Sequence, residues 1–280
     1  MRVFLLTALT MVAFAANSVL NRLALDAGEA GPASFAAIRL ISGAVMLALL
    51  VAARGGGVKW RVGAAGPAAL VLYVLGFSFA YVSLPAGVGA LILFGGVQVT
   101  MFAGALIGGD VVPMRRWLGA GVSFAGLCYL MWPAGGAAPD VLGAGLMLAA
   151  ALGWGVYSLI GRGVRDPLAV TAASFLWAAP VAMLVWLIRP DASSMAGFWL
   201  AVVSGAVTSG LGYALWYHVL PGLGATRAAV AQLTVPVIAI AGGALFLGEA
   251  LSLRVVVASL LVLGGVGIAN YARTSRSSGS

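Results

Sequence analysis

Two similar short stretches reveal how the chain is organised: "GALIGGDVVPMR" (residues 104–115) and "GALFLGEALSLR" (residues 243–254). Each opens with Gly-Ala-Leu, continues to a glycine and an acid, and has an arginine five residues after that acid. We expect an apolar helix to end at this glycine, with the acid following at once. The shift between the stretches is 139 residues (243 minus 104). A pattern that returns after half the chain indicates an internal repeat.

The composition excludes a water-soluble domain. The 280 residues are 62% hydrophobic and 8% charged, with a mean hydropathy of +1.10. A soluble domain has roughly 25% charged residues, so lipid must solvate this chain. Apolar runs of about 18 or more residues can each cross a bilayer. We predict an all-α membrane protein with ten transmembrane helices at about 3–25, 33–53, 64–83, 86–108, 116–133, 141–161, 168–188, 197–217, 224–247 and 253–271.

The basic residues predict the orientation in the membrane. A net charge of +8 would suggest nucleic acid for a soluble protein, but here the basic residues fall between apolar runs. With ten helices both termini share one side. That side would hold eleven of the 15 basic residues, all except Arg22, Arg39, Arg189 and Arg254. We therefore expect cytoplasmic termini, with the first segment retained as a helix rather than cleaved as a signal peptide.

Further matches extend the repeat. "YVSLP" (81–85) resembles "YHVLP" (217–221), and "FAANSVLNR" (14–22) resembles "WGVYSLIGR" (154–162). We predict a first repeat at 1–135, a second at 136–272, and a polar tail at 273–280. Five helices per repeat is an odd number, so the second repeat enters the membrane from the opposite side. Inverted repeats of this kind place a substrate site near the membrane midplane between the halves.

The repeated acids, Asp110 and Glu249, have a structural interpretation. Each lies where one helix stops and the next starts, so its carboxylate would complement the free N–H groups of the following helix. Ser252 would cap the helix that follows Glu249. Arg115 could pair with Asp110, or Arg254 with Glu249. The alternative is that these acids carry coupling protons. We favour the structural role, because both lie at helix ends rather than mid-membrane.

The same features resemble those of a known family. Ten helices in two halves, each with "GALxxG" and an acid after its fourth helix, resemble the EamA family of the drug/metabolite transporter superfamily. "FAANSVLNRLAL" (14–25), "PASFAAIRL" (32–40) and "VPVIAIAGGALFLGEALSLR" (235–254) carry the likeness, which covers about the whole chain. One departure is Val97, where members often have a mid-helix proline like Pro236 in the ninth helix. It puts symmetric hinging of the two halves in doubt.

The resemblance implies a function. Family members of this size and aromatic content include bacterial exporters of aromatic and other neutral amino acids, the YddG type. The resemblance therefore implies a secondary transporter that exposes a central apolar cavity alternately to each side of the membrane. The alternative is an efflux carrier of hydrophobic drugs or other metabolites. One chain supplies both halves, so we expect a monomer to suffice, with a small-molecule substrate and the lipid bilayer as partners and no nucleic acid.

The candidate site combines a hinge with an aromatic cavity. Pro236 lacks an N–H, so it frees the carbonyl of Gln232 and bends its helix, as a hinge or simply as a packed kink. Aromatic rings in a cavity supply apolar contact and stack on flat substrates, although Trp and Tyr also mark membrane interfaces. We predict that the cavity is lined by Asn17, Phe77, Ser78, Tyr81, Phe94, Gln98, Met101, Trp154, Tyr157, Ser209, Tyr213, Trp216 and Gln232.

The residue types that the predicted helices lack limit which substrates the protein could carry. No predicted helix has an acid at mid-membrane, whereas carriers of cationic drugs usually need a buried carboxylate there. Asn17 stands in the middle of the first helix instead. We therefore expect a cargo without net positive charge. Arg39 is the only basic residue well inside an apolar run. It could pair with a substrate carboxylate, but we expect it to extend its charge outward near the helix end.

Enzyme classes are disfavoured by what the chain lacks. An aspartyl intramembrane protease needs a second buried aspartate, and a zinc metalloprotease needs the H-E-x-x-H pattern, whereas His218 is the single histidine. Lys59, the single lysine, lies in a loop and cannot hold a Schiff base inside a helix. Cys128, the single cysteine, cannot build a thiolate metal cage. We expect no enzyme activity, no metal and no cofactor. The other alternative is a scaffold or receptor that transports nothing, and it would show no flux under any gradient.

Overall fold

The computed structural model describes residues 1–58, 62–109, 112–132, 138–161 and 164–270, with the backbone alone at 224–230 and 270. These ranges are helical and contain no strand beyond an isolated bridge between Ala30 and Ser193. The helices are α1 (Arg2–Asp26), α2 (Pro32–Ala53), α3 (Ala65–Ala80), α4 (Ala86–Ile107), α5 (Met114–Met131), α6 (Val141–Ile160), α7 (Pro167–Ile188), α8 (Met195–Val202), the π-helix η1 (Val203–Leu211), α9 (Gly212–Gln232), α10 (Thr234–Leu247) and α11 (Leu253–Asn270).

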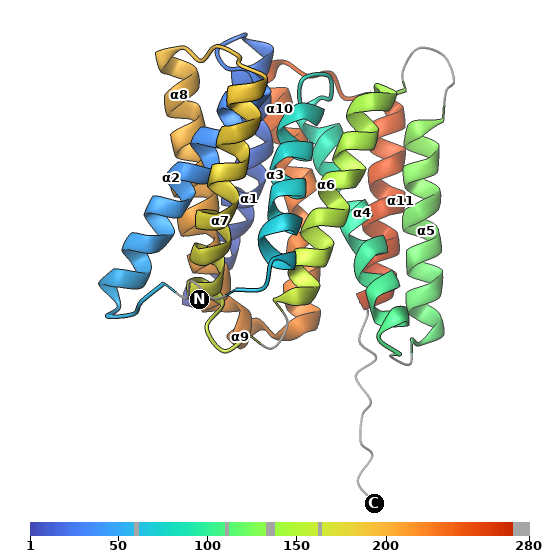
Figure 1. Cartoon of the computed structure of the whole chain (residues 1–280). Coiled ribbons are helices and arrows are strands. Elements are labelled where there is room, and N and C mark those ends of the chain that lie inside the picture. Colours follow the sequence, from blue (N-terminus) through green and yellow to red (C-terminus); the bar gives the residue numbers. More distant parts are fainter. Residues whose placement is uncertain (59–61, 110–111, 133–137, 162–163, 271–280) are drawn as a thin grey trace, which may run out of the picture.

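The helices form an upright bundle (Figure 1). Because α8, η1 and α9 run on without a break, the described ranges contain ten helices, the predicted number. Six of the described segments are long and apolar enough to span a membrane: 2–26, 32–53, 86–107, 141–160, 167–188 and 195–223. Three shorter apolar helices, 65–80, 234–247 and 253–269, accompany them. These helices make the chain a multi-pass membrane protein.

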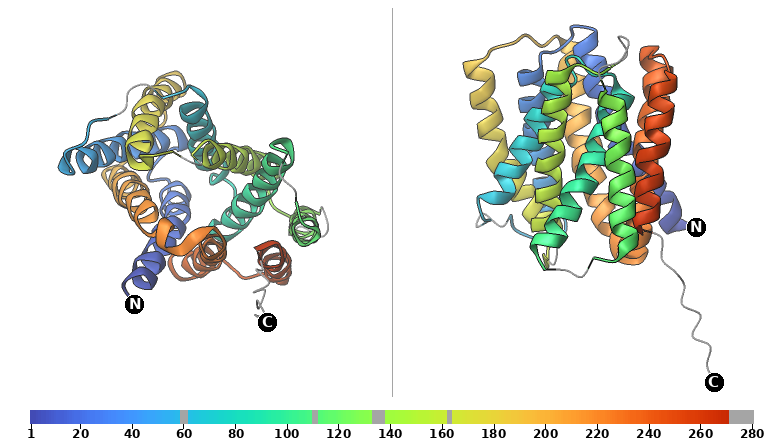
Figure 2. Two further views of the ribbon diagram at one scale, coloured as in Figure 1. Left: turned by 90° about the horizontal axis from the view of Figure 1, so that it is seen from below. Right: turned by 90° about the vertical axis from the view of Figure 1, so that its right-hand side faces the viewer.

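Helices far apart in sequence pack in pairs. α5 packs on α11, α3 on α6, α2 on α7, and α4 on both α6 and α10. α1 contacts η1, α9 and α10, and α2 also contacts η1. The pair of α5 and α11 stands at one edge of the bundle (Figure 2). The centre is therefore built from helices of both halves of the chain.

Glycine allows helices to approach closely in these pairs. A Cβ atom added at Gly153 on α6 would lie 2.6 Å from the carbonyl oxygen of Ala69 on α3 and 2.7 Å from the backbone nitrogen of Tyr73. No real side chain tolerates such distances from backbone atoms. Small residues at helix contacts are typical of membrane bundles, in which van der Waals packing holds helices together.

The helix ends marked by the repeated pattern are confirmed. Gly248 closes α10 in the left-handed conformation with φ +65°, and the N–H of Glu249 then donates to the carbonyl of Gly243 over 3.1 Å. Gly109, its counterpart after α4, has φ +76°. Only glycine adopts this conformation without a steric penalty from Cβ.

The junction between the eighth and ninth predicted helices is displaced. We expected a turn at "LPGLG" (220–224), but α9 continues through Pro221 to Gln232. The break comes at Leu233, and α10 starts at Thr234, which places Pro236 in its first turn. A first-turn proline breaks no helical hydrogen bond, because the N–H there has no partner within the helix. Pro236 therefore follows a helix break instead of kinking a continuous helix.

Candidate substrate site

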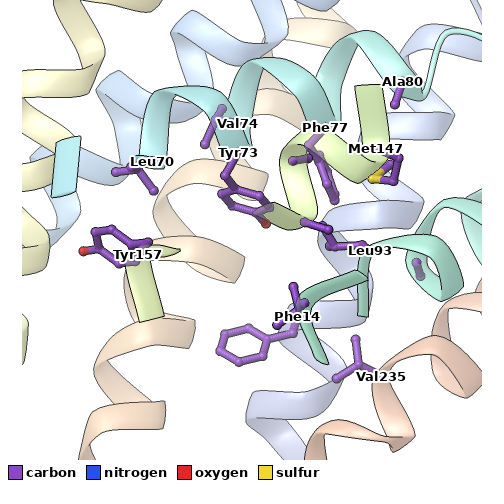
Figure 3. Packing of buried hydrophobic residues seen from close by; sticks show 14 of the residues in the cluster. Phe14, Leu70, Tyr73, Val74, Phe77, Ala80, Leu93, Met147, Tyr157 and Val235 are labelled. Atoms are coloured by element: carbon purple, nitrogen blue, oxygen red, sulfur yellow. The ribbon is translucent and has the colours of Figure 1, made fainter. Parts of the chain in front are cut away.

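A small buried cavity lies at the centre of the bundle. It is lined by α1, α3, α4, α6 and α9 through Phe14, Asn17, Ser18, Tyr73, Phe77, Leu93, Phe94, Trp154, Tyr213 and Gln232. Figure 3 shows Tyr73 and Phe77 projecting from one side of α3, near Leu93 of α4 and Phe14 of α1. The cavity volume is about 20 Å³, which holds about one water molecule. In this conformation the site is closed around its own side chains.

Aromatic rings make up most of the lining. The rings of Trp154 and Tyr213 stack with centroids 5.3 Å apart and planes 17° apart. Tyr73 lies 5.1 Å from Trp154, and Phe14 meets Tyr213 edge-on at 5.7 Å. Such pairs stabilise the packing by about 0.5–1.5 kcal/mol each beyond the burial of their area. Rings from five helices, α1, α3, α4, α6 and α9, thus surround one space that is mostly apolar.

Six of the thirteen predicted lining residues line this cavity: Asn17, Phe77, Phe94, Trp154, Tyr213 and Gln232. Sequence reasoning missed Phe14, Ser18, Tyr73 and Leu93 as lining residues. Tyr73 had a signal, because it stands four residues before Phe77 and residues so spaced share one helix face. The others had no signal beyond membership of an apolar helix.

The remaining predicted residues lie outside the lining. The Tyr157 hydroxyl donates to Thr171 Oγ1 over 3.1 Å, and the Tyr81 hydroxyl donates to the carbonyl of Ala86 over 3.2 Å. Gln98 and Met101 are half-buried. Three more have other partners: Ser78 accepts from Asn21 Nδ2 at 3.0 Å, Trp216 packs on Phe14 at 5.9 Å, and Ser209 donates to Asn17 at 3.4 Å.

Asn17 joins α1 to the π-helix. Its Oδ1 accepts hydrogen bonds from Ser204 Oγ at 2.9 Å, Thr208 Oγ1 at 2.6 Å and Ser209 Oγ at 3.4 Å. These hydroxyls stand at spacings of four and five residues. The wide turn of a π-helix brings such positions onto one face, which an α-helix does less well. The distortion of η1 thus gathers three donors on one buried amide oxygen.

Arg39 lies next to the cavity, which contradicts the expectation that its charge reaches outward. Its side chain is fully buried on α2. Nε donates to Ser209 Oγ and Nη2 to the Tyr73 hydroxyl, each over 3.2 Å. Its guanidinium carbon is 4.9 Å from the ring centroid of Phe77 and 5.5 Å from that of Tyr73. The outward path is closed because α3, α7 and η1 pack against α2.

Comparison with known proteins decides the family. Residues 141–271 match the model of the EamA-like transporter family. A relative in Pseudomonas aeruginosa, described as an uncharacterized protein, is 47% identical over 98% of this chain and 96% of its own. The chain belongs to the EamA-like transporter family. The resemblance to the drug/metabolite transporter superfamily is thereby confirmed.

Two further likenesses are to a more distant relative and to a solved structure. An uncharacterized transporter of Archaeoglobus fulgidus is 24% identical over 84% of this chain and 87% of its own. A protein of known crystal structure superposes on this EamA-like transporter with a TM-score of 0.67. That alignment covers 93% of this chain and 96% of the other at 22% identity, so it shows the fold alone.

The carboxylates of this EamA-like transporter lie at helix ends. Among the residues described, Asp191 accepts from the N–H groups of Ala33 and Ser34, at 2.8 and 2.9 Å, at the start of α2. Asp140 accepts from Gly143 N–H at 2.7 Å and from Ser83. Those bonds, the backbone one above all, hold the pKa of Asp140 below its usual value. None of the six described acids lines the cavity, and Asp110 lies outside the described residues.

Glu249 caps a helix in the other half of the EamA-like transporter. We expected it to serve α11, which follows it, but its Oε1 accepts from Ala86 N–H at the start of α4 over 2.7 Å. Its arginine neighbour is Arg22, 3.9 Å away. Ser252 caps α11 by accepting from Val255 N–H at 3.2 Å, as predicted. Arg254 donates to the carbonyl of Trp132 over 2.9 Å.

Arg115 is the remaining arginine that we expected to pair with an acid at a repeated turn. It lies in the first turn of α5 and is exposed.

Proposed function

We propose that this EamA-like transporter is a secondary transporter that exports neutral, including aromatic, amino acids or similarly sized metabolites. The observation that carries the proposal is the cavity shared by Tyr73, Phe77, Trp154 and Tyr213, which none of the described carboxylates enters. Rings suit flat or apolar side chains, and Asn17 and Gln232 offer the few polar groups that fix orientation. A lining without acid gives a cationic drug no counter-charge.

Helix pairing supports the inverted repeats, 1–135 and 136–272, on which alternating access depends. With a shift of 139 residues α1 corresponds to α6, α2 to α7, α4 to α10, and α5 to α11. Contacts then come in matched sets: α2–α7, α4–α10 and α5–α11 pair a helix with its own counterpart, and α4–α6 matches α10–α1. A two-fold relation in the membrane plane produces such pairs. The family match at 141–271 falls within the second repeat.

Transport requires the closed cavity to open. About 20 Å³ cannot hold an amino acid, so the helices around the site must separate toward one side of the membrane at a time. Pro236 is the proposed hinge, because the break at Leu233 beside it already interrupts the hydrogen-bonded ladder. Gln232, which lines the cavity, ends α9 next to that break. Motion of α10 would therefore reach the site directly.

The setting we propose is a bacterial inner membrane with both termini in the cytoplasm. The bias of basic residues supports this orientation, and the Pseudomonas aeruginosa relative supports a bacterial membrane. One chain holds both repeats and the whole cavity lining, so a monomer is the proposed working unit, without a cofactor.

Flux into proteoliposomes tests the proposal. Purified full-length protein is reconstituted, and uptake of radiolabelled tryptophan, methionine and threonine is measured beside a cationic dye, each with and without a pH gradient. We expect saturable amino-acid flux and no dye flux. Trp154→Ala and Tyr213→Ala should each lower the amino-acid flux about tenfold, since each removes at least two ring contacts of about 0.5–1.5 kcal/mol, and about 1.4 kcal/mol corresponds to tenfold. Trp199→Ala is the matched control, because Trp199 is 56% exposed on α8.

The outcomes separate the two candidate functions. Amino-acid flux that the triple variant Trp154→Ala, Tyr213→Ala, Gln232→Ala leaves unchanged would contradict the site. Dye flux without amino-acid flux would favour efflux of hydrophobic drugs. Dependence of the flux on the gradient would distinguish proton antiport from facilitated diffusion.

A further inference from the structure

Arg39 has an unused hydrogen-bonding side. A guanidinium carries five N–H donors and no acceptor. Two of its nitrogens are engaged, Nε with Ser209 and Nη2 with Tyr73. Nη1 is buried and has no hydrogen-bond partner. A buried cation with an unsatisfied nitrogen is strongly disfavoured inside a membrane protein unless something compensates it.

None of the described protein groups supplies the missing negative charge. Arg39 forms no ion pair within the described residues, and the six acids described there all have other partners at helix ends. Contacts with the rings of Phe77 and Tyr73 are attractive but neutral, so they lower the energy of the cation without balancing its charge. A mobile anion that enters from the cavity would balance it.

The cavity is the route by which such an anion would arrive. Tyr73 and Phe77 contact Arg39 on one side and line the cavity on the other. Ser209 accepts from Arg39 and donates to Asn17, which also lines the cavity. Arg39 is thus one layer of side chains behind the lining. Opening of the cavity between α2, α3 and η1 would bring its free nitrogen into contact with the contents.

We propose that Arg39 binds the carboxylate of the transported substrate. Its Nη1 meets one carboxylate oxygen, while the apolar part of the substrate packs on Tyr73, Trp154 and Tyr213. This rests on the proposed transport function and narrows its cargo to molecules with a free carboxylate next to an apolar group. A charge-assisted bond of this kind selects acids over their amides and amines.

A ligand series on the unaltered protein tests this without relying on any variant. Binding to purified full-length protein in detergent is measured by calorimetry for tryptophan, tryptophanamide, tryptamine and indole-3-acetate. These probes share one ring and differ in the carboxylate and the amine. We expect tryptophan and indole-3-acetate to bind, and the amide and amine to bind about ten- to hundredfold more weakly. Equal binding of tryptophan and its amide would overturn the proposal, as would absence of binding by both carboxylates.

Variants then assign the effect to Arg39. Arg39→Gln should weaken carboxylate binding about ten- to hundredfold and abolish the preference over the amide, whereas Arg39→Lys should keep part of that preference. The matched control is Arg54→Gln, just past the end of the same helix, since Arg54 pairs with Asp166 away from the cavity. A folded Arg39→Gln protein that still prefers the acid would overturn the proposal.

The proposed function can fail separately. Binding of indole-3-acetate that depends on Arg39, with no flux of any amino acid, would support the carboxylate site and reject amino acids as cargo. Equal flux of tryptophan and of tryptophanamide would support the transport function and reject the role of Arg39.

Discussion

Glu249 accepts a hydrogen bond from the backbone N–H of Ala86, 163 residues earlier, over 2.7 Å. Its second oxygen faces the N–H of Gly87 at 3.5 Å, and Arg22 of α1 approaches within 3.9 Å. Arg22 also donates to the carbonyls of Tyr81 and Val82 at the end of α3, each over 3.0 Å. One acid and one arginine therefore connect α1, α3, α4 and the turn after α10.

Glu249→Ala should destabilise the protein by about 0.5–2 kcal/mol, because the first N–H groups of α4 lose their acceptor. Glu249→Gln should cost less, since its amide oxygen can still accept while the charge next to the helix dipole is lost. Thermal unfolding in detergent measures both. Any pH dependence of flux should survive Glu249→Gln. Its loss would show instead that Glu249 carries the coupling proton.

The control for this cap is Asp26→Asn. Asp26 pairs with the same Arg22, at 2.5 Å, but its side chain is half exposed. Exposed pairs contribute about 0–1 kcal/mol, so the melting temperature should change little. An equal loss in both variants would mean that Arg22, and not the cap on α4, is what matters.

Gly153→Ala should force α3 and α6 apart. The added Cβ would meet the backbone of Ala69 and Tyr73 at 2.6–2.7 Å, and backbone atoms cannot rotate away as a side chain can. We expect a loss of about 1–3 kcal/mol and lower flux, because Tyr73 and the adjacent Trp154 both line the cavity. Gly145→Ala on the same helix meets nothing within 4 Å and should be neutral or stabilising. Equal stability of the two variants would contradict this packing.

Asn17→Asp should introduce an internal competitor for the ligand. Position 17 is linked to Arg39 through Ser209, so a carboxylate there would supply the charge that Arg39 lacks. We expect the apparent affinity for tryptophan in a counterflow assay to fall about tenfold or more. Asn21→Asp is the control one turn further along α1, where the amide donates to Ser78 instead. Unchanged affinity in Asn17→Asp would argue against a carboxylate site at Arg39.

Labelling should place the two ends of the bundle on opposite sides of the membrane. α2 ends and α8 begins at opposite ends (Figure 1). After Cys128→Ser removes the single cysteine, Ala192→Cys before α8 should react with an impermeant maleimide added to intact cells. Gly57→Cys after α2 should react only once the membrane is permeabilised, because the basic side is cytoplasmic. The reverse pattern would overturn the proposed orientation.

Local signals made much of the fold predictable. Hydropathy located ten helices, since in lipid each segment must satisfy its own backbone hydrogen bonds and so forms a helix almost independently of its neighbours. The glycines at 109 and 248 marked helix ends for an equally local reason, a positive φ. The boundary near 220–224 failed because a proline and two glycines suggest a turn, whereas α9 continues through them.

Local sequence signals were enough to predict a membrane bundle of ten helices, a repeated helix stop, and a chain with few charges. The partners of those charges follow only from the packing of the helices. Arg39 reaches Tyr73, 34 residues away, and Ser209, 170 residues away, while Glu249 serves α4 rather than the helix beside it. Hydropathy records that a segment enters lipid, not which of its faces turns inward. That choice depends on packing between helices, which brings together residues from opposite halves of the chain.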